Sequence, residues 1–310
     1  MFAAVEDYPR TLGEFEARFA SEEACRAYLA QLRWPNGFVC PRCGGSKAWP
    51  ARGVLWHCAG CGRQTSVTAG TIFQDTRSPL TTWFRAMWAV TSQKTGASAL
   101  AVQHVLGLGS YQTAWTWLHK LRRAMVRPGR DRLTGRVEVD ETFLGGLGGA
   151  QGRSTATKAL IAVAAEAVGR GIGRIRMRQI PDASARSLNA FIGEAITPGS
   201  VVHTDGWRGY DQVKAHGYRH RVTFLRGDPA RADLLPRVHR IVSLLKRWLL
   251  GTHQGAVNRA HLDYYLDEFT FRFNRRRSQH RGKLFFRLVE QAVASGPVPY
   301  KRLVQSDHRR

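Results

Sequence analysis

Hydrophobic positions in the N-terminal part of the chain recur at helical spacing. Residues 14–32 place apolar side chains near one stripe and acidic side chains on most of the rest, which predicts a single helix. The stripe consists of Phe15, Phe19, Cys25, Tyr28 and Leu29. Residues 81–90 carry a second stripe, formed by Trp83, Phe84, Met87 and Trp88. An aromatic stripe at this spacing is more typical of a core than of a binding platform, and we interpret it as core.

Two more helices are predicted at residues 98–106 and 111–123, on either side of a glycine-containing turn. The pattern fits a helix-turn-helix motif, and it also fits a plain helical hairpin. In a helix-turn-helix, the second helix would present polar side chains to DNA, here Gln112, Thr113, Thr116 and Lys120. Trp115 and Leu118 would then anchor that helix in the protein interior.

From residue 136 onward the pattern changes to short β-like runs. Strands are predicted up to Asp140, at 159–165 and at 175–180, followed by a helix at 183–196, strands at 201–204 and 218–224, and helices from residue 238. This order of elements is that of the α/β ribonuclease-H-like fold, a mixed sheet flanked by helices. In that fold, acidic residues of the first and fourth strands meet at one edge of the sheet.

Asp140 and Asp205 each end one of these β-like runs. An ionised carboxylate at the end of a buried strand must be paired or bind a cation, so the two acids predict a split metal site. For either acid alone, the alternative is a cap of the following turn. Strand alternation puts Glu138 on the same face as Asp140, where it is a reserve ligand or a paired acid.

The charge balance indicates a polyanionic partner. The 310 residues include 47 Lys and Arg against 23 Asp and Glu, which gives a formal net charge of +24. Binding to nucleic acid with counterion release is the usual use of such basicity, although ribosomal and membrane-surface proteins share it. We find no apolar run long enough for a membrane span and no signal peptide, which favours a cytoplasmic protein.

Four of the five cysteines form two C-x-x-C pairs, Cys40 with Cys43 and Cys58 with Cys61. Two such pairs supply the four thiolates of a tetrahedral structural Zn²⁺ site. The alternatives are a redox dithiol, which needs only one pair, and unmetallated core cysteines. His57 could replace one ligand, but four thiolates already suffice, so we interpret it as a solvent-facing neighbour.

Three segments carry a resemblance to a known family: VEVDET at 137–142, HTDGWRGY at 203–210 and YLDEFTFRFNRR at 265–276. With the cysteine pairs and the helical segment, the chain resembles bacterial insertion-sequence transposases of the zinc-ribbon DDE type over roughly residues 28–286. The resemblance implies a ribonuclease-H-like domain that binds two Mg²⁺ ions, cuts transposon ends and joins the freed 3′-hydroxyl to target DNA. It also implies that Asp140 and Asp205 are the first two catalytic aspartates.

The third ligand departs from the pattern of that family, because the helix expected to supply it has no carboxylate between residues 235 and 246. His239 lies seven residues before Lys246, where relatives often carry glutamate, and we assign it as the third ligand of catalytic Mg²⁺ or Mn²⁺. A neutral imidazole favours Mn²⁺ over Mg²⁺. Some relatives instead place an asparagine two residues before the lysine, and that position here is Leu244.

Other roles for these residues stay open. His239 could cap its helix or contact phosphate, and Asp233, Asp267 and Glu268 are possible substitutes as ligands. Asp267 and Glu268 lie in a predicted amphipathic helix at 258–274, where ion pairs with nearby arginines are the plainer role.

Several basic side chains are candidates for DNA contact. Lys246, Arg247 and Lys158 could hold phosphates, with solvated charges as the alternative. Arg275 and Arg276 belong to a basic run interleaved with phenylalanines, which predicts contact with the DNA backbone. The glycine-rich stretch 145–152 lacks the setting of a phosphate loop, and we interpret it as a flexible hairpin.

These predictions divide the chain into an N-terminal helix with a zinc ribbon (1–76), a helical DNA-binding segment (77–130), a ribonuclease-H-like transposase domain (131–290) and a basic tail (291–310). The predicted function is a DNA transposase with structural Zn²⁺ and catalytic Mg²⁺ or Mn²⁺. It would act on double-stranded DNA as a homodimer or larger synaptic complex, associated with the nucleoid. Two alternatives stay open: a catalytically inactive DNA-binding regulator and a structure-selective nuclease of the same fold.

Overall fold

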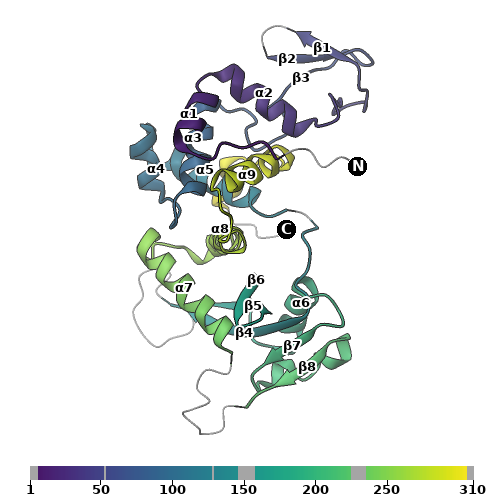
Figure 1. Cartoon of the computed structure of the whole chain (residues 1–310), viewed down its shortest axis with the longest axis vertical. Helices are drawn as coiled ribbons and strands as arrows, with labels where there is room; N and C mark the ends of the chain where they lie inside the picture. Colours follow the sequence, from purple (N-terminus) through teal and green to yellow (C-terminus); the bar gives the residue numbers. More distant parts are fainter. Residues whose placement is uncertain (1–5, 52–53, 128, 146–157, 225–234, 306–310) are drawn as a thin grey trace. The chain divides into compact units, whose positions relative to one another are not determined.

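The computed structural model divides the chain into two compact units (Figure 1). The first consists of Met1–Arg127 and Arg277–Arg310, and the second of Pro128–Arg276. Residues 6–51, 54–127, 129–145, 158–224 and 235–305 are described. Residues 277–290, expected to belong to the transposase domain, therefore cluster with the N-terminal helices.

The first unit is mainly helical. Its helices are α1 (Leu12–Arg18), α2 (Glu22–Arg33), α3 (Leu80–Ser92), α4 (Ala99–Leu106), α5 (Tyr111–Ala124), α9 (Gly282–Ala294) and α10 (Tyr300–Val304). The prediction of one helix at 14–32 is wrong, because the helix is interrupted between α1 and α2. Ser21 is extended there and caps α2 by accepting a hydrogen bond from the Ala24 N–H at 3.2 Å.

Aromatic side chains form the core of this unit. The ring of Phe285 in α9 lies 5.3 Å from that of Phe15 and 5.6 Å from those of Phe19 and Phe84. Phe84 and its neighbours in the stripe of α3 are buried, which confirms the interpretation of that stripe as core. The packing of α9 onto α2, α3 and α5 explains why the C-terminal helices belong to the first unit.

The four paired cysteines lie in and beside a small three-stranded sheet of the same unit. Its strands β1 (Ala48–Ala51), β2 (Leu55–Cys58) and β3 (Gln64–Ser66) pair antiparallel in that order. This is the zinc ribbon expected from the spacing of the cysteines.

The second unit is built on a five-stranded mixed sheet. Its strands are β4 (Arg136–Leu144), β5 (Ala159–Val168), β6 (Gly171–Ile180), β7 (Val201–Thr204) and β8 (Arg219–Val222). The spatial order is β6-β5-β4-β7-β8, with antiparallel pairing from β6 to β4 and parallel pairing from β4 to β8. This topology is the ribonuclease-H-like fold, as expected.

Helices cover both faces of this sheet (Figure 1). They are α6 (Ala185–Ala195), α7 (Pro236–His253) and α8 (Leu262–Asn274), with short 3-10 turns at Arg208–Tyr210, Lys214–His216 and Arg259–His261. Alternate residues of β4 face opposite cores: Val137 and Val139 pack with α6, whereas Leu144 packs with α7 and α8. Position along β4 therefore decides which helix each side chain meets.

One predicted boundary matters for the site. The first strand was expected to end at Asp140, but β4 continues to Leu144 because it stays paired with β5 over its whole length. Asp140 thus lies within a strand and pairs with Val163. Asp205, in contrast, directly follows the end of β7, as expected.

Candidate active site and zinc site

The four paired cysteines of the ribbon lie together. Their Sγ atoms all lie within 4.8 Å of one another, with 3.6 Å from Cys40 to Cys61 and 3.6 Å from Cys43 to Cys58. Tetrahedral zinc with bonds of about 2.3 Å separates its sulfur ligands by about 3.8 Å. The observed spacing and the all-thiol donor set therefore fit a structural Zn²⁺.

Each C-x-x-C turn is closed by its own backbone. Gly44 and Gly62 both adopt a φ of 71°, which favours glycine, and their N–H groups donate to the carbonyls of Cys40 and Cys58. The N–H groups of Cys43 and Arg42 lower the pKa of Cys40 to about 6, which favours the thiolate that a metal requires.

His57 lies outside the cysteine cluster. Its ring stacks on that of Trp49 with centroids 4.6 Å apart. This contact agrees with its interpretation as a neighbour of the zinc site.

In the second unit, the register of the sheet brings the two predicted catalytic aspartates together. β4 and β7 run parallel, with Arg136 opposite Val201 and Glu138 opposite His203. β7 ends at Thr204, so Asp205 follows it directly, and the charge of Asp205 acts on Asp140.

Burial raises the pKa of Asp140, and the charge of Asp205 raises it further, although the Glu141 N–H and His239 partly offset both effects. The Glu141 N–H donates to Asp140 Oδ1 at 2.9 Å. The Trp207 N–H donates to Asp205 Oδ1 at 3.0 Å. A cation bound between the two carboxylates would reduce the electrostatic repulsion between them.

His239 reaches the same place from α7, which packs against β4. Its Nε2 lies 3.4 Å from Asp140 Oδ2, and the two side chains are 45% and 20% exposed. Among the described residues, the four cysteines form the only group of three or more potential ligands whose atoms all lie within 4.8 Å. Asp140, Asp205 and His239 do not form such a group, and the exposure of His239 and Asp140 leaves their site open to solvent.

The other candidate ligands are placed differently. Glu138 is buried and paired with Arg237 of α7 at 2.7 Å, so it is the paired acid of the two roles considered. Asp267 and Glu268 are buried in α8, which packs against β6, and β5 separates β6 from β4. Asp233 lies outside the described residues.

The sequence reasoning missed the acid next to Asp140 and its partner. Glu141 points to the opposite face of the sheet and accepts a hydrogen bond from the Tyr210 hydroxyl. Burial raises the pKa of Glu141, although the Tyr210 hydroxyl lowers it. Both residues stand in the motifs DET and DGWRGY, but only the fold shows that they meet.

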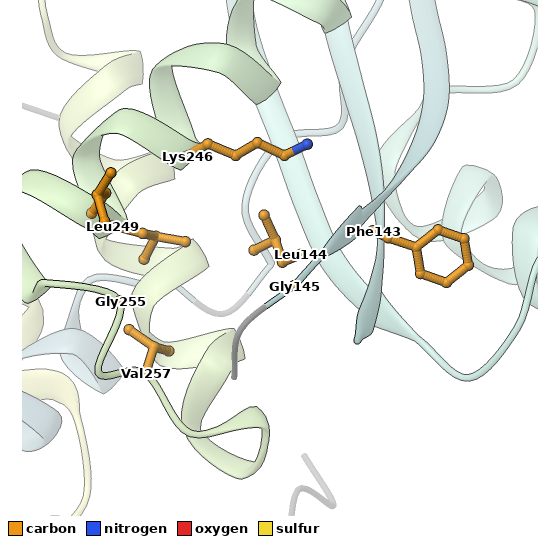
Figure 2. Close-up of a pocket in the computed structure, with 8 residues that line it drawn as sticks. Phe143, Leu144, Gly145, Lys246, Leu249, Gly255 and Val257 are labelled. Atoms are coloured by element: carbon orange, nitrogen blue, oxygen red, sulfur yellow. The ribbon is translucent and has the colours of Figure 1, made fainter. Parts of the chain in front are cut away.

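Lys246 and Arg247, two of the predicted phosphate contacts, are exposed on α7. Lys246 lies seven residues after His239, close to two full helical turns, and therefore on the same side of α7. It lines a pocket of about 310 Å³ with Leu144, Gly145 and Leu249 (Figure 2). Lys158 is half-buried, and most of the glycine-rich stretch 145–152 lies outside the described residues.

Arg275 and Arg276 are engaged with the protein. The Arg275 guanidinium lies 4.0 Å from the ring centroid of Phe271, and that of Arg276 lies 3.9 Å from Phe273. Arg276 also donates to the carbonyl of Gly173 at 3.2 Å. The hydrogen bond of Arg276 joins the end of α8 to β6. DNA contact by the two arginines stays a prediction.

The predicted helix-turn-helix forms as α4 and α5, joined by Gly107 in the left-handed conformation. Of the DNA-facing candidates on α5, Gln112 is exposed, Thr116 is partly buried and donates to the Gln112 carbonyl, and burial lowers the pKa of Lys120. The buried anchors are Trp117 and Leu118, whereas Trp115 is only partly buried. Contact of α5 with DNA stays a prediction.

A zinc ribbon followed by a ribonuclease-H-like domain is the domain arrangement of insertion-sequence transposases of the zinc-ribbon DDE type. Comparison with known families agrees: residues 132–274 match the ISXO2-like transposase domain, and residues 20–64 match the transposase zinc-ribbon domain. Both matches are to models of IS1595-type insertion-sequence transposases, to which the chain is similar in its zinc ribbon and in its second unit.

Comparison with individual proteins found a curated relative and a solved structure that are similar to this chain. A protein of Halobacterium salinarum described as an uncharacterized protein in transposable element ISH50 is 27% identical over 275 residues, which cover 82% of this chain and 91% of the relative. Among solved structures, a chain of the simian T-cell lymphotropic virus intasome in complex with PP2A regulatory subunit B56 gamma aligns at 15% identity and a TM-score of 0.30. That alignment covers 53% of this chain and 63% of the other.

No helix in the described part of the chain is both long and apolar enough to cross a membrane.

Proposed function

We propose that the second unit cuts phosphodiester bonds at the ends of its insertion sequence and joins the freed 3′-hydroxyl to target DNA. The observation that supports this proposal is that Asp205 and His239 both lie near Asp140. Asp205 directly follows β7, the parallel neighbour of β4, and its charge raises the pKa of Asp140, while His239 Nε2 lies 3.4 Å from Asp140 Oδ2. Bound Mg²⁺ or Mn²⁺ would activate the attacking hydroxyl and stabilise the leaving oxygen.

The roles of the residues follow from their positions. Asp140 and Asp205 would hold the divalent ions, since the neighbouring N–H groups of Glu141 and Trp207 orient their carboxylates. His239 would be the third ligand, through Nε2 of the neutral ring. Because an imidazole carries less charge than a carboxylate, we expect Mn²⁺ to support more activity than Mg²⁺.

Double-stranded DNA is the proposed partner. The net charge of +24 favours a polyanion, and Lys246 and Arg247 are exposed on the helix that carries His239. α5 would contact the element ends as the second helix of a helix-turn-helix. Since transposition joins two ends to one target, the active assembly would contain at least two copies of the chain.

The test is strand cleavage and joining on DNA that carries the element's own ends, with Mg²⁺ or Mn²⁺. We expect Asp140→Ala and Asp205→Ala to abolish both steps and His239→Ala to reduce them strongly. Glu194→Gln, which changes a half-exposed acid on α6, is the matched control and should keep full activity.

Three results would contradict the proposal or its assignments. End binding without cleavage by the unmodified protein would favour an inactive regulator. Cleavage of branched DNA regardless of end sequence would favour a structure-selective nuclease. Full activity of His239→Ala would remove that residue from the ligand set.

A further inference from the structure

Arg237, the second residue of α7, is fastened to the sheet through both its side chain and its backbone. The guanidinium donates to Glu138 Oε1 at 2.7 Å, to the Gly171 carbonyl at 3.0 Å and to the Gly169 carbonyl at 2.7 Å. Gly169 and Gly171 lie at the turn between β5 and β6. One side chain thus ties the start of α7 to β4 and to the neighbouring hairpin.

Glu138 also accepts hydrogen bonds from the backbone of the first turn of that helix. Its Oε2 accepts the N–H of Arg237 at 2.8 Å and the N–H of Val238 at 3.3 Å. These groups belong to the first turn of α7, where N–H groups have no partner within the helix. A carboxylate satisfies them, and its charge also suits the positive end of the helix dipole.

Both oxygens of Glu138 are therefore engaged by the protein. The side chain is 1% exposed, against 15% for Arg237. Because its oxygens are buried and hydrogen-bonded, the Glu138 carboxylate is not free to bind a metal at the Asp140 site. Any effect of Glu138 on that site must therefore act through Arg237 and the first turn of α7.

The backbone that Glu138 binds is next to His239 in the sequence. Val238, whose N–H it accepts, immediately precedes His239, and Asp140 lies two residues after Glu138 on the same face of β4. One strand thus carries the first aspartate and the acceptor that holds the helix of the third proposed ligand. We propose that Glu138, together with Arg237, is a positioning residue that sets His239 against Asp140 for metal binding. This inference rests on the proposed function.

The prediction separates positioning from simple stabilisation. Removing one partner of a buried ion pair always destabilises a fold, so lost activity alone would not distinguish the two roles. A positioning role requires that Glu138 change metal affinity, and that it do so only while His239 is present. Residues that support metal ligands typically change affinity by 10–100-fold.

The experiment titrates the zinc-loaded full-length protein with Mn²⁺ and follows free Mn²⁺ by electron paramagnetic resonance, without DNA. Glu138→Gln replaces one acceptor oxygen with an amide N–H₂, so either the helix N–H groups or the guanidinium lose their partner. We expect it to weaken Mn²⁺ binding by about 10–100-fold. The matched control is Glu166→Gln, because Glu166 is also a buried acid, paired with Arg174 at 2.7 Å, but it accepts from the N–H groups of Thr134 and Arg174 and not from those of α7. It should leave Mn²⁺ affinity unchanged.

The decisive comparison repeats Glu138→Gln in the His239→Ala protein. If Glu138 acts through His239, its replacement has no further effect there, because the two changes share one interaction. If Glu138→Gln does not fold, Arg237→Lys takes its place, since lysine keeps the charge and the helix N–H bonds but loses the fork that grips both turn carbonyls. Arg237→Lys should weaken Mn²⁺ binding about threefold or more, again only while His239 is present.

Three outcomes would overturn the inference: equal effects of Glu138→Gln and Glu166→Gln, an undiminished effect of Glu138→Gln in the His239→Ala protein, or unchanged affinity in Arg237→Lys. None of them bears on whether the unmodified protein cuts and joins DNA. Conversely, an unmodified protein that binds Mn²⁺ through His239 but never cuts its ends would refute the proposed function and leave the positioning role intact.

Discussion

Single side chains hold the sheet of the second unit together by accepting several hydrogen bonds each. Glu166 on β5 accepts from the Thr134 N–H at 2.9 Å and from the Arg174 guanidinium at 2.7 Å. Burial by itself would raise the pKa of Glu166, but these bonds outweigh it and lower the pKa. The ionised form of Glu166 therefore stabilises the folded state.

We expect Glu166→Gln to lower the free energy of unfolding by about 2 kcal/mol at neutral pH. A lowered folded pKa means that this contribution is complete above the unfolded value of 4.5 and is lost as the pH falls through the folded value. In urea unfolding, the difference in stability between the two proteins should therefore shrink as the pH is lowered below 4.5.

The control for this prediction is Glu194→Gln. Glu194 pairs with Arg178 but is 54% exposed, so its replacement should cost less than about 1 kcal/mol at either pH. A Glu166 effect that stayed constant down to acidic pH would show that ionisation of this residue is not the cause.

At the scale of elements, caps decide where the helices of the proposed DNA-binding hairpin begin. The Ser98 hydroxyl accepts from the Ala101 N–H at 3.2 Å and starts α4. The Ser110 hydroxyl accepts from the Thr113 N–H at 3.1 Å and starts α5. The two caps are chemically alike, but only the second lies beside Gln112.

Ser110→Ala and Ser98→Ala should each lower stability by about 1 kcal/mol, because each leaves a helix N–H without its cap. If α5 is the recognition helix, only Ser110→Ala should also weaken binding to the element ends. Thermal unfolding and end-binding titrations would measure the two effects. Equal loss of affinity in both variants would remove the special role of α5.

At the scale of the whole molecule, charge governs association with DNA. A net charge of +24 on 310 residues gives a long-range attraction to duplex DNA that salt weakens. Each phosphate neutralised contributes about −0.9 to the slope of log affinity against log salt concentration.

We expect duplex affinity to fall by roughly 10³-fold or more between about 50 and 200 mM salt. Lys246→Gln should reduce the magnitude of the slope by about 0.9 if this lysine contacts one phosphate. The measurement is a salt series of fluorescence-anisotropy titrations on unrelated duplex DNA. An unchanged slope would show that Lys246 does not contact a DNA phosphate.

Sequence patterns sufficed where a property depends on near neighbours. The C-x-x-C spacing of Cys40 and Cys43 predicted a cluster that the fold brings together, and the order of strands predicted that the strand of Asp140 and the strand before Asp205 are neighbours. The break at Ser21 was missed although its signal, a serine before two acids, is local. The hydrophobic stripe continues across residues 14–32 and predicts one helix, although the Ser21 cap predicts a new helix start.

By itself, the sequence determined the fold class, the group of four cysteines and the strand order that makes β4 and β7 neighbours, because hydrophobic period, ligand spacing and strand order are properties of the linear chain. Only the tertiary structure decided that Glu138 is an anchor for α7, that Tyr210 holds Glu141, and that α9 belongs to the first unit. These contacts join residues separated by 99 positions in one case and 69 in another. No local pattern encodes such pairs, since burial and hydrogen-bond partners arise only when distant elements pack.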